Sequence, residues 1–246
     1  MEKTRYWLID ALRGLALVNM LAFHFLYDVF VVFGREPTWY LRPGVRIWQQ
    51  GICWSFILIA GFSFTWGRAH NLRRGLLLTL CGFLITAVTL IAVPSEAIWF
   101  GVLNLLGACV LLTIPLEKPL ARIPAALGLA LFAALFFLFR PVSAGHLAFG
   151  IPLPRALYTC RVLTPLGFPY PGFRSSDYFP LLPWYFLFLC GFTLKRLFDR
   201  CPAAQRLAQV KIPLLSAIGQ KTLWVYMLHQ PVLMGVCLLL HRLQLL

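Results

Sequence analysis

Charge is what this sequence has least of, and acidic side chains are the scarcest. Only 12% of the 246 residues are charged, and 8 Asp and Glu stand against 22 Lys and Arg. Soluble domains usually carry about 25% charged residues, so the composition excludes an ordinary soluble globular protein. Apolar side chains make up 60% of the chain and come in long runs. Such runs are typical of an integral membrane protein.

The excess of basic residues has a simple explanation in a membrane protein. A net charge of +14 would suggest nucleic-acid binding in a soluble chain. Here Lys and Arg collect between the apolar runs, where they set orientation and meet anionic lipid headgroups. Nothing in the sequence indicates base readout. We therefore expect contacts with membrane lipids and no nucleic-acid partner.

Several catalytic and cofactor motifs are also missing. The seven cysteines are scattered and no CxxC pair occurs, so we expect no metal site. The Walker loop and the GxGxxG, HExxH and GxSxG patterns are absent as well. No span contains a pair of carboxylates that suggests glycoside hydrolysis. Any donor molecule must then be held by loops and helix ends.

The apolar runs predict an all-α polytopic bundle of about seven transmembrane helices. Each run is close to the roughly 20 residues that cross a bilayer. They lie at 8–33, 47–66, 73–93, 97–116, 123–139, 180–198 and 216–241. With no internal repeat and no second domain, residues 1–246 are expected to form a single domain.

The basic residues predict the orientation of this bundle. With seven spans, one side receives most of the Lys and Arg near span ends, among them Lys3, Arg5, Arg68, Arg73, Arg74, Lys118, Arg122, Lys195, Arg196, Arg200, Arg206 and Lys211. By the positive-inside rule that side is cytoplasmic. The N-terminus is then inside, and the protein is a multi-pass protein of the cell membrane.

The segment 140–179 is expected to be a long extracytoplasmic element. It is rich in Pro, Gly and aromatic residues. Long ordered segments of this kind often form lids or binding walls. We predict that it folds over the outer mouth of the bundle, with a short helix near 154–163.

The first span carries an unusual polar stripe. Asp10, Arg13, His24 and Asp28 all lie in an otherwise apolar run, where each charge is costly. Arg13 and His24 are eleven residues apart, so they share a face at a spacing of roughly 16 Å. Asp10 lies one turn before Arg13, and Asp28 one turn after His24. The alternative to function is a buried network that only locks helix packing.

The stripe is suited to proton transfer and to anion binding. A neutral His24 can take a proton from an amine or hydroxyl nucleophile. The carboxylate of Asp28 can orient the ring and stabilise the imidazolium. Arg13, near the cytoplasmic end, can bind a phosphate.

The last span holds a second polar group. Lys221 lies at its inner end, and Tyr226 and His229 share a face one turn apart. Pro231 would kink the helix and free carbonyl groups. The competing interpretation is a kinked helix with an interfacial lysine and internal hydrogen bonds.

Three further positions are candidates for substrate binding. Asp177 and Trp184 flank the start of the span at 180–198, where Asp177 could instead be a helix N-cap. Asn104 opens the span at 97–116 and needs partners if it is buried.

Taken in order, these stretches resemble a known family. Asp10-Ala11-Leu12-Arg13-Gly14 followed by His24 is similar to the Arg-x10-His pattern of the acyltransferase family 3 membrane enzymes. The set formed by 23–28, 100–104, 177–184 and 219–231 is closer to bacterial relatives of the heparan-alpha-glucosaminide N-acetyltransferase catalytic domain. The resemblance is collinear and covers most of the chain.

The resemblance implies a transmembrane acyltransferase. Such enzymes take an acyl group, commonly acetyl, from cytosolic acyl-CoA and place it on a sugar amine or hydroxyl across the membrane. By motif position His24 is the essential histidine and Arg13 the arginine, and His229 belongs to the terminal motif.

The expected site follows from these residues. His24 and Asp28 would be catalytic, and the phosphates of acetyl-CoA would meet cations on the inner side, namely Arg13, Arg68, Arg73, Arg74 and Lys221. A glycan or sugar acceptor would contact Asn104, Asp177, Trp184, Tyr226 and His229. We expect the protein to lie in a bacterial plasma membrane. The sequence is compatible with a homodimer. The alternatives are a small-molecule transporter or proton-coupled carrier, and an inactive CoA-binding or scaffolding membrane protein.

Overall fold

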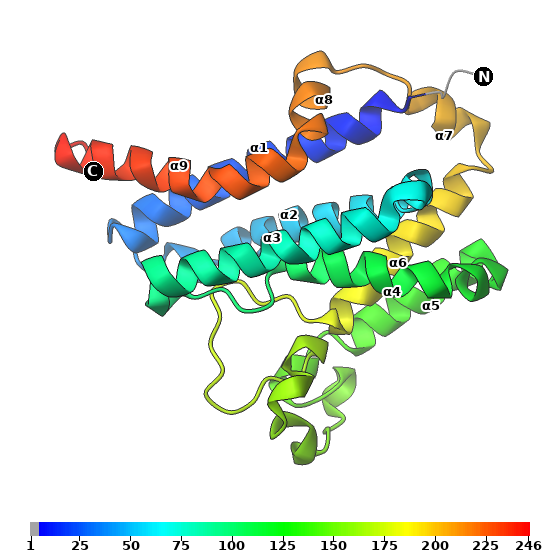
Figure 1. Cartoon of the computed structure of the whole chain (residues 1–246), viewed down its shortest axis with the longest axis horizontal. Coiled ribbons are helices and arrows are strands. Elements are labelled where there is room, and N and C mark those ends of the chain that lie inside the picture. Colours follow the sequence, from blue (N-terminus) through cyan, green and yellow to red (C-terminus); the bar gives the residue numbers. More distant parts are fainter. Residues whose placement is uncertain (1–4) are drawn as a thin grey trace. The chain divides into compact units, whose positions relative to one another are not determined.

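The computed structural model describes residues 5–246, and most of it is helical (Figure 1). Helix accounts for 76% of the chain, and the described residues contain no strand. The predicted all-α membrane bundle is confirmed. Lys3, one of the basic residues used for orientation, lies outside the described part.

Six helices of the described chain are long and apolar enough to cross a membrane. They span Trp7–Val32, Thr65–Ala92, Val102–Arg122, Ala125–Ala144, Leu181–Phe198 and Thr222–Arg242. The run predicted at 47–66 corresponds to α2 (Pro43–Phe62), which has 20 residues but is not one of these six. Its first half carries Arg46, Gln49 and Gln50, which lower its hydropathy.

The chain divides into two compact units, which we describe separately. The terminal unit comprises Met1–Phe56 and Cys201–Leu246, and the central unit comprises Ile57–Arg200. The boundary falls within α2.

The terminal unit is built on α1 (Trp7–Tyr27), which continues as a π-helix, η1 (Asp28–Val32). The part of α2 up to Phe56 belongs to it as well. It is completed by the 3-10 turn η2 (Trp39–Leu41) and the helices α7 (Pro202–Leu207), α8 (Pro213–Gln220) and α9 (Thr222–Arg242). Its core contains Leu17, Met20, Phe23, Trp39 and Ile52.

The backbones of α1 and α8 touch at two glycines. A Cβ atom on Gly14 would lie 2.0 Å from the Leu215 carbonyl oxygen, and one on Gly219 would lie 1.8 Å from the Asp10 carbonyl oxygen. Glycine permits this close approach. The run predicted as one span at 216–241 is therefore two helices: α8 ends at Gln220, and the backbone leaves helical geometry at Lys221.

The central unit pairs its helices two by two. Helix α3 (Asn71–Ala92) packs on α4 (Val102–Arg122), and α5 (Ala125–Leu138) packs on α6 (Leu181–Phe198). The end of α2 meets α6 where a Cβ on Gly61 would lie 1.9 Å from the Phe188 carbonyl oxygen. Arg196 of α6 donates to the carbonyl oxygens of Leu120, Ala121 and Ile123, and so caps the end of α4.

The connection after α5 consists of short turns. It contains the 3-10 turns Val142–Ala144, Ala148–Gly150, Arg155–Tyr158 and Arg161–Leu166. The helix predicted near 154–163 is thus two 3-10 turns. The Tyr158 hydroxyl donates to the Val142 carbonyl oxygen, which ties the segment back onto itself. The role as a lid stays a prediction.

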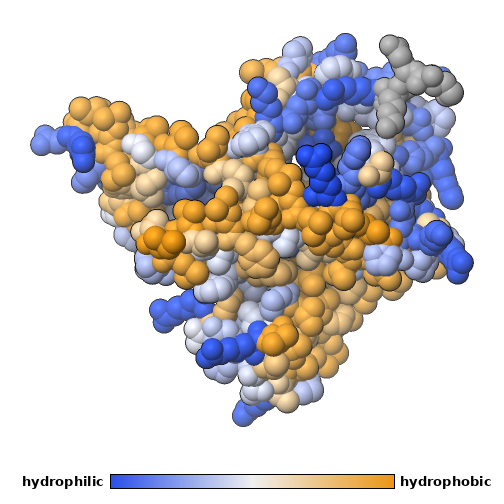
Figure 2. Space-filling model, in the orientation of Figure 1, coloured by the Kyte–Doolittle hydropathy of each residue, from blue (hydrophilic) through white to orange (hydrophobic). Residues whose placement is uncertain are grey.

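The surface carries the apolar groups that a membrane protein requires. Figure 2 shows apolar side chains over much of one face. On α3, Leu80, Phe83 and Ile91 are 66%, 62% and 84% exposed. A soluble protein rarely exposes so much contiguous apolar area, and lipid is the solvent that these side chains suit.

Candidate active site

The N-terminal end of the polar stripe in α1 is an ion-paired cluster. Arg13 Nη1 lies 2.8 Å from Asp10 Oδ1, so the predicted pair is confirmed. Arg5 adds two hydrogen bonds to Asp10 Oδ2, of 3.1 and 2.9 Å. Sequence reasoning missed Arg5, which precedes the helix and reaches back over its first turn. Asp10 is 8% exposed, so these cations balance a buried charge.

His24 lies against a second histidine. The ring centroids of His24 on α1 and His229 on α9 are 4.8 Å apart, with 62° between the ring planes. Both residues belong to the terminal unit. The sequence singled out each histidine by itself, but it contained no signal that they meet. The contact brings together two groups that can accept and donate protons.

A backbone contact fixes the tautomer of His229. Its Nδ1 hydrogen-bonds to the Tyr226 carbonyl oxygen, one turn earlier on α9. Because a carbonyl oxygen only accepts, Nδ1 must carry the proton. The Nε2 atom of a neutral His229 then holds a lone pair. The Tyr226 ring lies 5.3 Å from the His229 ring, as their predicted common face requires.

Asp28 contacts α9 rather than His24. Its side chain is fully buried, and its two carboxylate oxygens accept from Gln230 Nε2 at 2.9 and 3.1 Å. Within residues 5–246 the structure records no hydrogen bond between Asp28 and His24. Asp28 begins the π-helix η1, whereas the sequence interpretation assumed a regular α-helix. Gln230 received no role from the sequence, although a lone amide in an apolar run before Pro231 is a signal.

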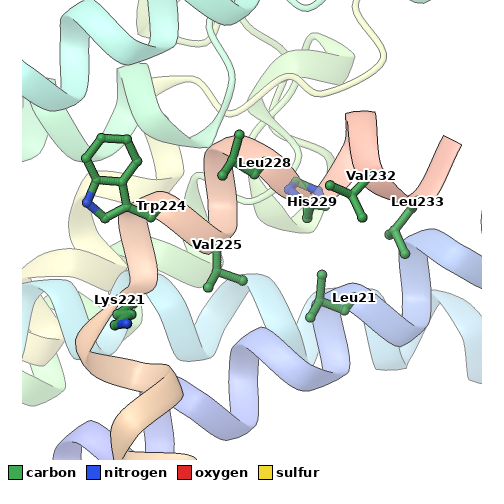
Figure 3. Close-up of a pocket in the computed structure, with 8 residues that line it drawn as sticks. All are labelled: Leu21, Lys221, Trp224, Val225, Leu228, His229, Val232 and Leu233. Atoms are coloured by element: carbon green, nitrogen blue, oxygen red, sulfur yellow. The ribbon is translucent and has the colours of Figure 1, made fainter. Parts of the chain in front are cut away.

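An apolar groove leads to His229. Its volume is about 300 Å³, and Leu21 of α1 faces residues from the start of α9 (Figure 3). The lining consists of Leu21, Lys221, Trp224, Val225, Leu228, His229, Val232 and Leu233. Lys221 lies eight residues before His229, about 12 Å along a helix axis. The groove therefore joins one exposed cation to one imidazole.

Asp177 lies in the central unit and caps a different helix from the one expected. Its Oδ2 accepts from the Val102 backbone N–H at 3.2 Å, at the start of α4. The alternative role as N-cap of the following helix is wrong, because α6 begins at Leu181 and takes no side-chain cap. Burial raises the pKa of the Asp177 carboxyl to about 6, and the hydrogen bond from Val102 offsets part of this effect.

The other two candidates for acceptor binding in the central unit are enclosed. Asn104 is 3% exposed beside Gly82, and its Oδ1 has no hydrogen-bond partner among residues 5–246. Trp184 is 5% exposed, with the Arg140 guanidinium 4.7 Å from its ring centre. Packing explains the position of Trp184, while Asn104 places a buried acceptor without a partner among the described residues.

The predicted phosphate-binding cations differ in their surroundings. Arg68 Nε donates to Glu117 Oε1 at 2.6 Å, so this arginine is ion-paired, as is Arg13. Arg73 and Lys221 are exposed, and Arg74 is half-buried. Arg68, Arg73 and Arg74 belong to the central unit, and Lys221 to the terminal unit.

No metal site is evident in the described chain. Residues 5–246 contain no group of three His, Cys, Asp or Glu side chains that could hold an ion. All seven cysteines are free thiols.

One comparison with known proteins gives a match. The family model described as heparan-alpha-glucosaminide N-acetyltransferase, catalytic, matches residues 5–231. The match covers the residues of both units from Arg5 to Pro231. Neither a curated protein nor a solved structure matches the chain.

Proposed function

Because the chain belongs to the heparan-alpha-glucosaminide N-acetyltransferase catalytic family, we propose that it moves an acetyl group from acetyl-CoA to an amine or hydroxyl of a sugar. The observation that carries this proposal is the contact of His24 with His229 in a membrane-spanning unit. Two imidazoles in contact, reached by a groove with a cation at its end, suit acyl transfer from a phosphate-bearing thioester.

In the proposed reaction His24 is the general base. The acceptor nitrogen or oxygen attacks the thioester carbonyl carbon, and a bond to that carbon forms as the carbon–sulfur bond breaks. His24 takes the proton of the nucleophile and returns it to the leaving thiolate, which gives CoA with a free thiol. His229 contacts the acceptor through the lone pair on Nε2. Asp28 remains a proposed residue of this site, where it contacts α9 through Gln230 and not the reacting atoms.

The proposed donor route runs along the groove of the terminal unit. Lys221 is exposed and would meet a phosphate of acetyl-CoA. The pantetheine arm would lie against Trp224, Val225 and Leu228, with the thioester near His229. Arg13, Arg68, Arg73 and Arg74 remain proposed phosphate contacts, and Asn104, Asp177, Trp184 and Tyr226 remain proposed acceptor contacts.

The proposed setting is the plasma membrane of a bacterium. The distribution of Lys and Arg favours a cytoplasmic N-terminus, so that acetyl-CoA enters from the cytosol. The sugar or glycan acceptor would then enter from the opposite side.

The direct test is release of CoA thiol. Purified protein in lipid nanodiscs, given acetyl-CoA and glucosamine, should release thiol and form the acetylated sugar. We expect His24→Ala to lower this rate at least 100-fold, since general-base catalysis is worth roughly 10²–10⁴. His70→Ala is the matched control, because His70 is an exposed histidine of the central unit. Equal rates for wild type and His24→Ala would refute the assignment.

A further inference from the structure

We propose that Gln230 is a positioning residue: its carboxamide clamps Asp28 and so holds the imidazole of His229 against that of His24. No role for Gln230 follows from the sequence pattern or from the family match. The proposal deepens the proposed function, on which its catalytic readout rests. Its binding readout rests on the geometry of the terminal unit alone.

Two side-chain contacts join the same two helices about one turn apart. His24 meets His229, and four residues after His24 the carboxylate of Asp28 meets Gln230, the neighbour of His229. The second contact fixes both the rotation and the axial position of α9 relative to α1 at that level. A shift of α9 by one residue would turn His229 by about 100° away from His24.

The clamp is hard to release because Asp28 has few other partners. Its side chain is fully buried, and within residues 5–246 it forms no ion pair with Lys, Arg or His. A buried carboxylate that loses its hydrogen-bond donor is strongly disfavoured. The amide of Gln230 therefore determines where α9 can sit.

The orientation of the Gln230 amide leaves its own oxygen without a hydrogen bond in the described chain. Gln230 must turn its nitrogen toward Asp28, and its Oε1 is then buried without a partner among the described residues. Buried orphan acceptors are rare and call for a reason other than packing. The π-helix that begins at Asp28 supports the same conclusion, because such segments are frequent at functional sites.

The affinity for zinc reports whether His24 and His229 are held close together, and its measurement does not depend on acyl transfer. Two imidazoles in contact can both ligate one Zn²⁺, at about 2.0–2.1 Å per nitrogen. The titration uses ZnCl₂ and the full chain in nanodiscs, in a Cys160→Ser/Cys201→Ser background because these two thiols are exposed. We expect the background protein, which keeps His24 and His229, to bind zinc at least tenfold more tightly than the same protein with His24→Ala. Adding Gln230→Leu instead should weaken zinc binding to the level of the His24→Ala variant.

A reciprocal exchange separates the clamp from a mere loss of folding. Gln230→Glu alone places two carboxylates face to face and should weaken zinc binding at least tenfold. Adding Asp28→Asn restores an amide–carboxylate pair with reversed direction, and should bring the zinc Kd back to within about threefold of wild type. The kcat of acetyl transfer should follow the zinc Kd across these variants, while the KM for acetyl-CoA stays unchanged.

Asn19→Leu is the matched control. It removes another polar contact of α1, the 3.0 Å hydrogen bond from Trp48 Nε1, and should leave the zinc Kd unchanged. Three results would overturn the proposal. Wild type could bind zinc no more tightly than His24→Ala, or Gln230→Leu could bind it as tightly as wild type. The third is a double variant, Gln230→Glu with Asp28→Asn, that binds zinc no more tightly than Gln230→Glu alone. If zinc behaves as expected but no variant transfers acetyl, the clamp stands and the proposed function fails.

Discussion

At the scale of the residue, the sequence singles out candidate polar groups but not their partners. His24, His229, Arg13 and Asp28 stand out because they are polar side chains in apolar runs. The pair of Asp10 with Arg13 was predictable from helical spacing, since both lie on one helix. The contact of Asp28 with Gln230 was not, because it joins residues 202 positions apart. Local periodicity carries no information about such a contact.

Asp177 predicts a pH dependence of stability. The pKa of its carboxyl is raised from 3.8 to about 6, mainly by burial, so the folded protein binds this proton more tightly than the unfolded chain does. The resulting stabilisation is complete below about pH 4 and is lost as the pH rises through about 6. Thermal unfolding in detergent should show that Asp177→Asn removes a gain in Tm between pH 7 and pH 5. An identical pH profile for both proteins would contradict this cause.

Lys221 predicts an effect on donor binding. If its ammonium meets a phosphate at the end of the groove, Lys221→Glu should raise the KM for acetyl-CoA about tenfold or more and leave kcat within about threefold. Lys118→Glu makes the same charge change at an exposed position of α4 and should alter KM little. Initial rates at several acetyl-CoA concentrations distinguish the two. A fall in kcat with no change in KM would assign Lys221 a different role.

At the scale of the element, the long helices were predictable and their interruptions were not. Mean hydropathy locates spans, but it does not register a break such as that at Lys221, where the backbone leaves helical geometry between α8 and α9. The π-helix at Asp28–Val32 is equally invisible to an apolar pattern, because the same residues would suit an α-helix. Both irregularities lie beside the candidate site, where departures from regular local structure are expected if the site is functional.

The close crossing of α1 with α8 predicts that adding one methyl group at Gly219 lowers the stability of the protein. A Cβ on Gly219 would lie 1.8 Å from a backbone oxygen, which cannot move aside as a side chain could. Gly219→Ala should destabilise the protein by about 1–3 kcal/mol or more, the usual range for overpacking. On α9, Gly235→Ala meets nothing within 4 Å and should be neutral or stabilising by up to about 1 kcal/mol. Thermal unfolding of both variants in one detergent tests this contrast, and equal Tm values would refute it.

At the scale of the whole molecule, composition was sufficient for the fold class. Long apolar runs and scarce charge predict a helical membrane bundle, because lipid leaves few other ways to satisfy the backbone. The division into two units was not predictable, since its boundary falls inside an unbroken helix, α2. Of the predicted site, His24, Asp28, Tyr226, His229, Arg13 and Lys221 share the terminal unit. The remaining candidates belong to the central unit.

The native cysteines can test the predicted orientation. Cys160 lies in the segment expected outside the cell, and Cys201 lies between α6 and α7 on the side expected inside; both are exposed. A membrane-impermeant maleimide applied to intact cells should label Cys160 and spare Cys201, with Cys160→Ser abolishing the signal. Labelling of Cys201 with Cys160 protected would invert the topology and the route proposed for acetyl-CoA.

The most direct test of the central claim is a double-mutant cycle on the two histidines, measured as the rate of acetyl transfer from acetyl-CoA. If His24 and His229 act together on one step, each alanine variant should lose activity by itself, and the double variant should be no slower than the slower single one. If the two losses multiply in the double variant, the histidines act independently, and the paired site described for the terminal unit is not the catalytic centre.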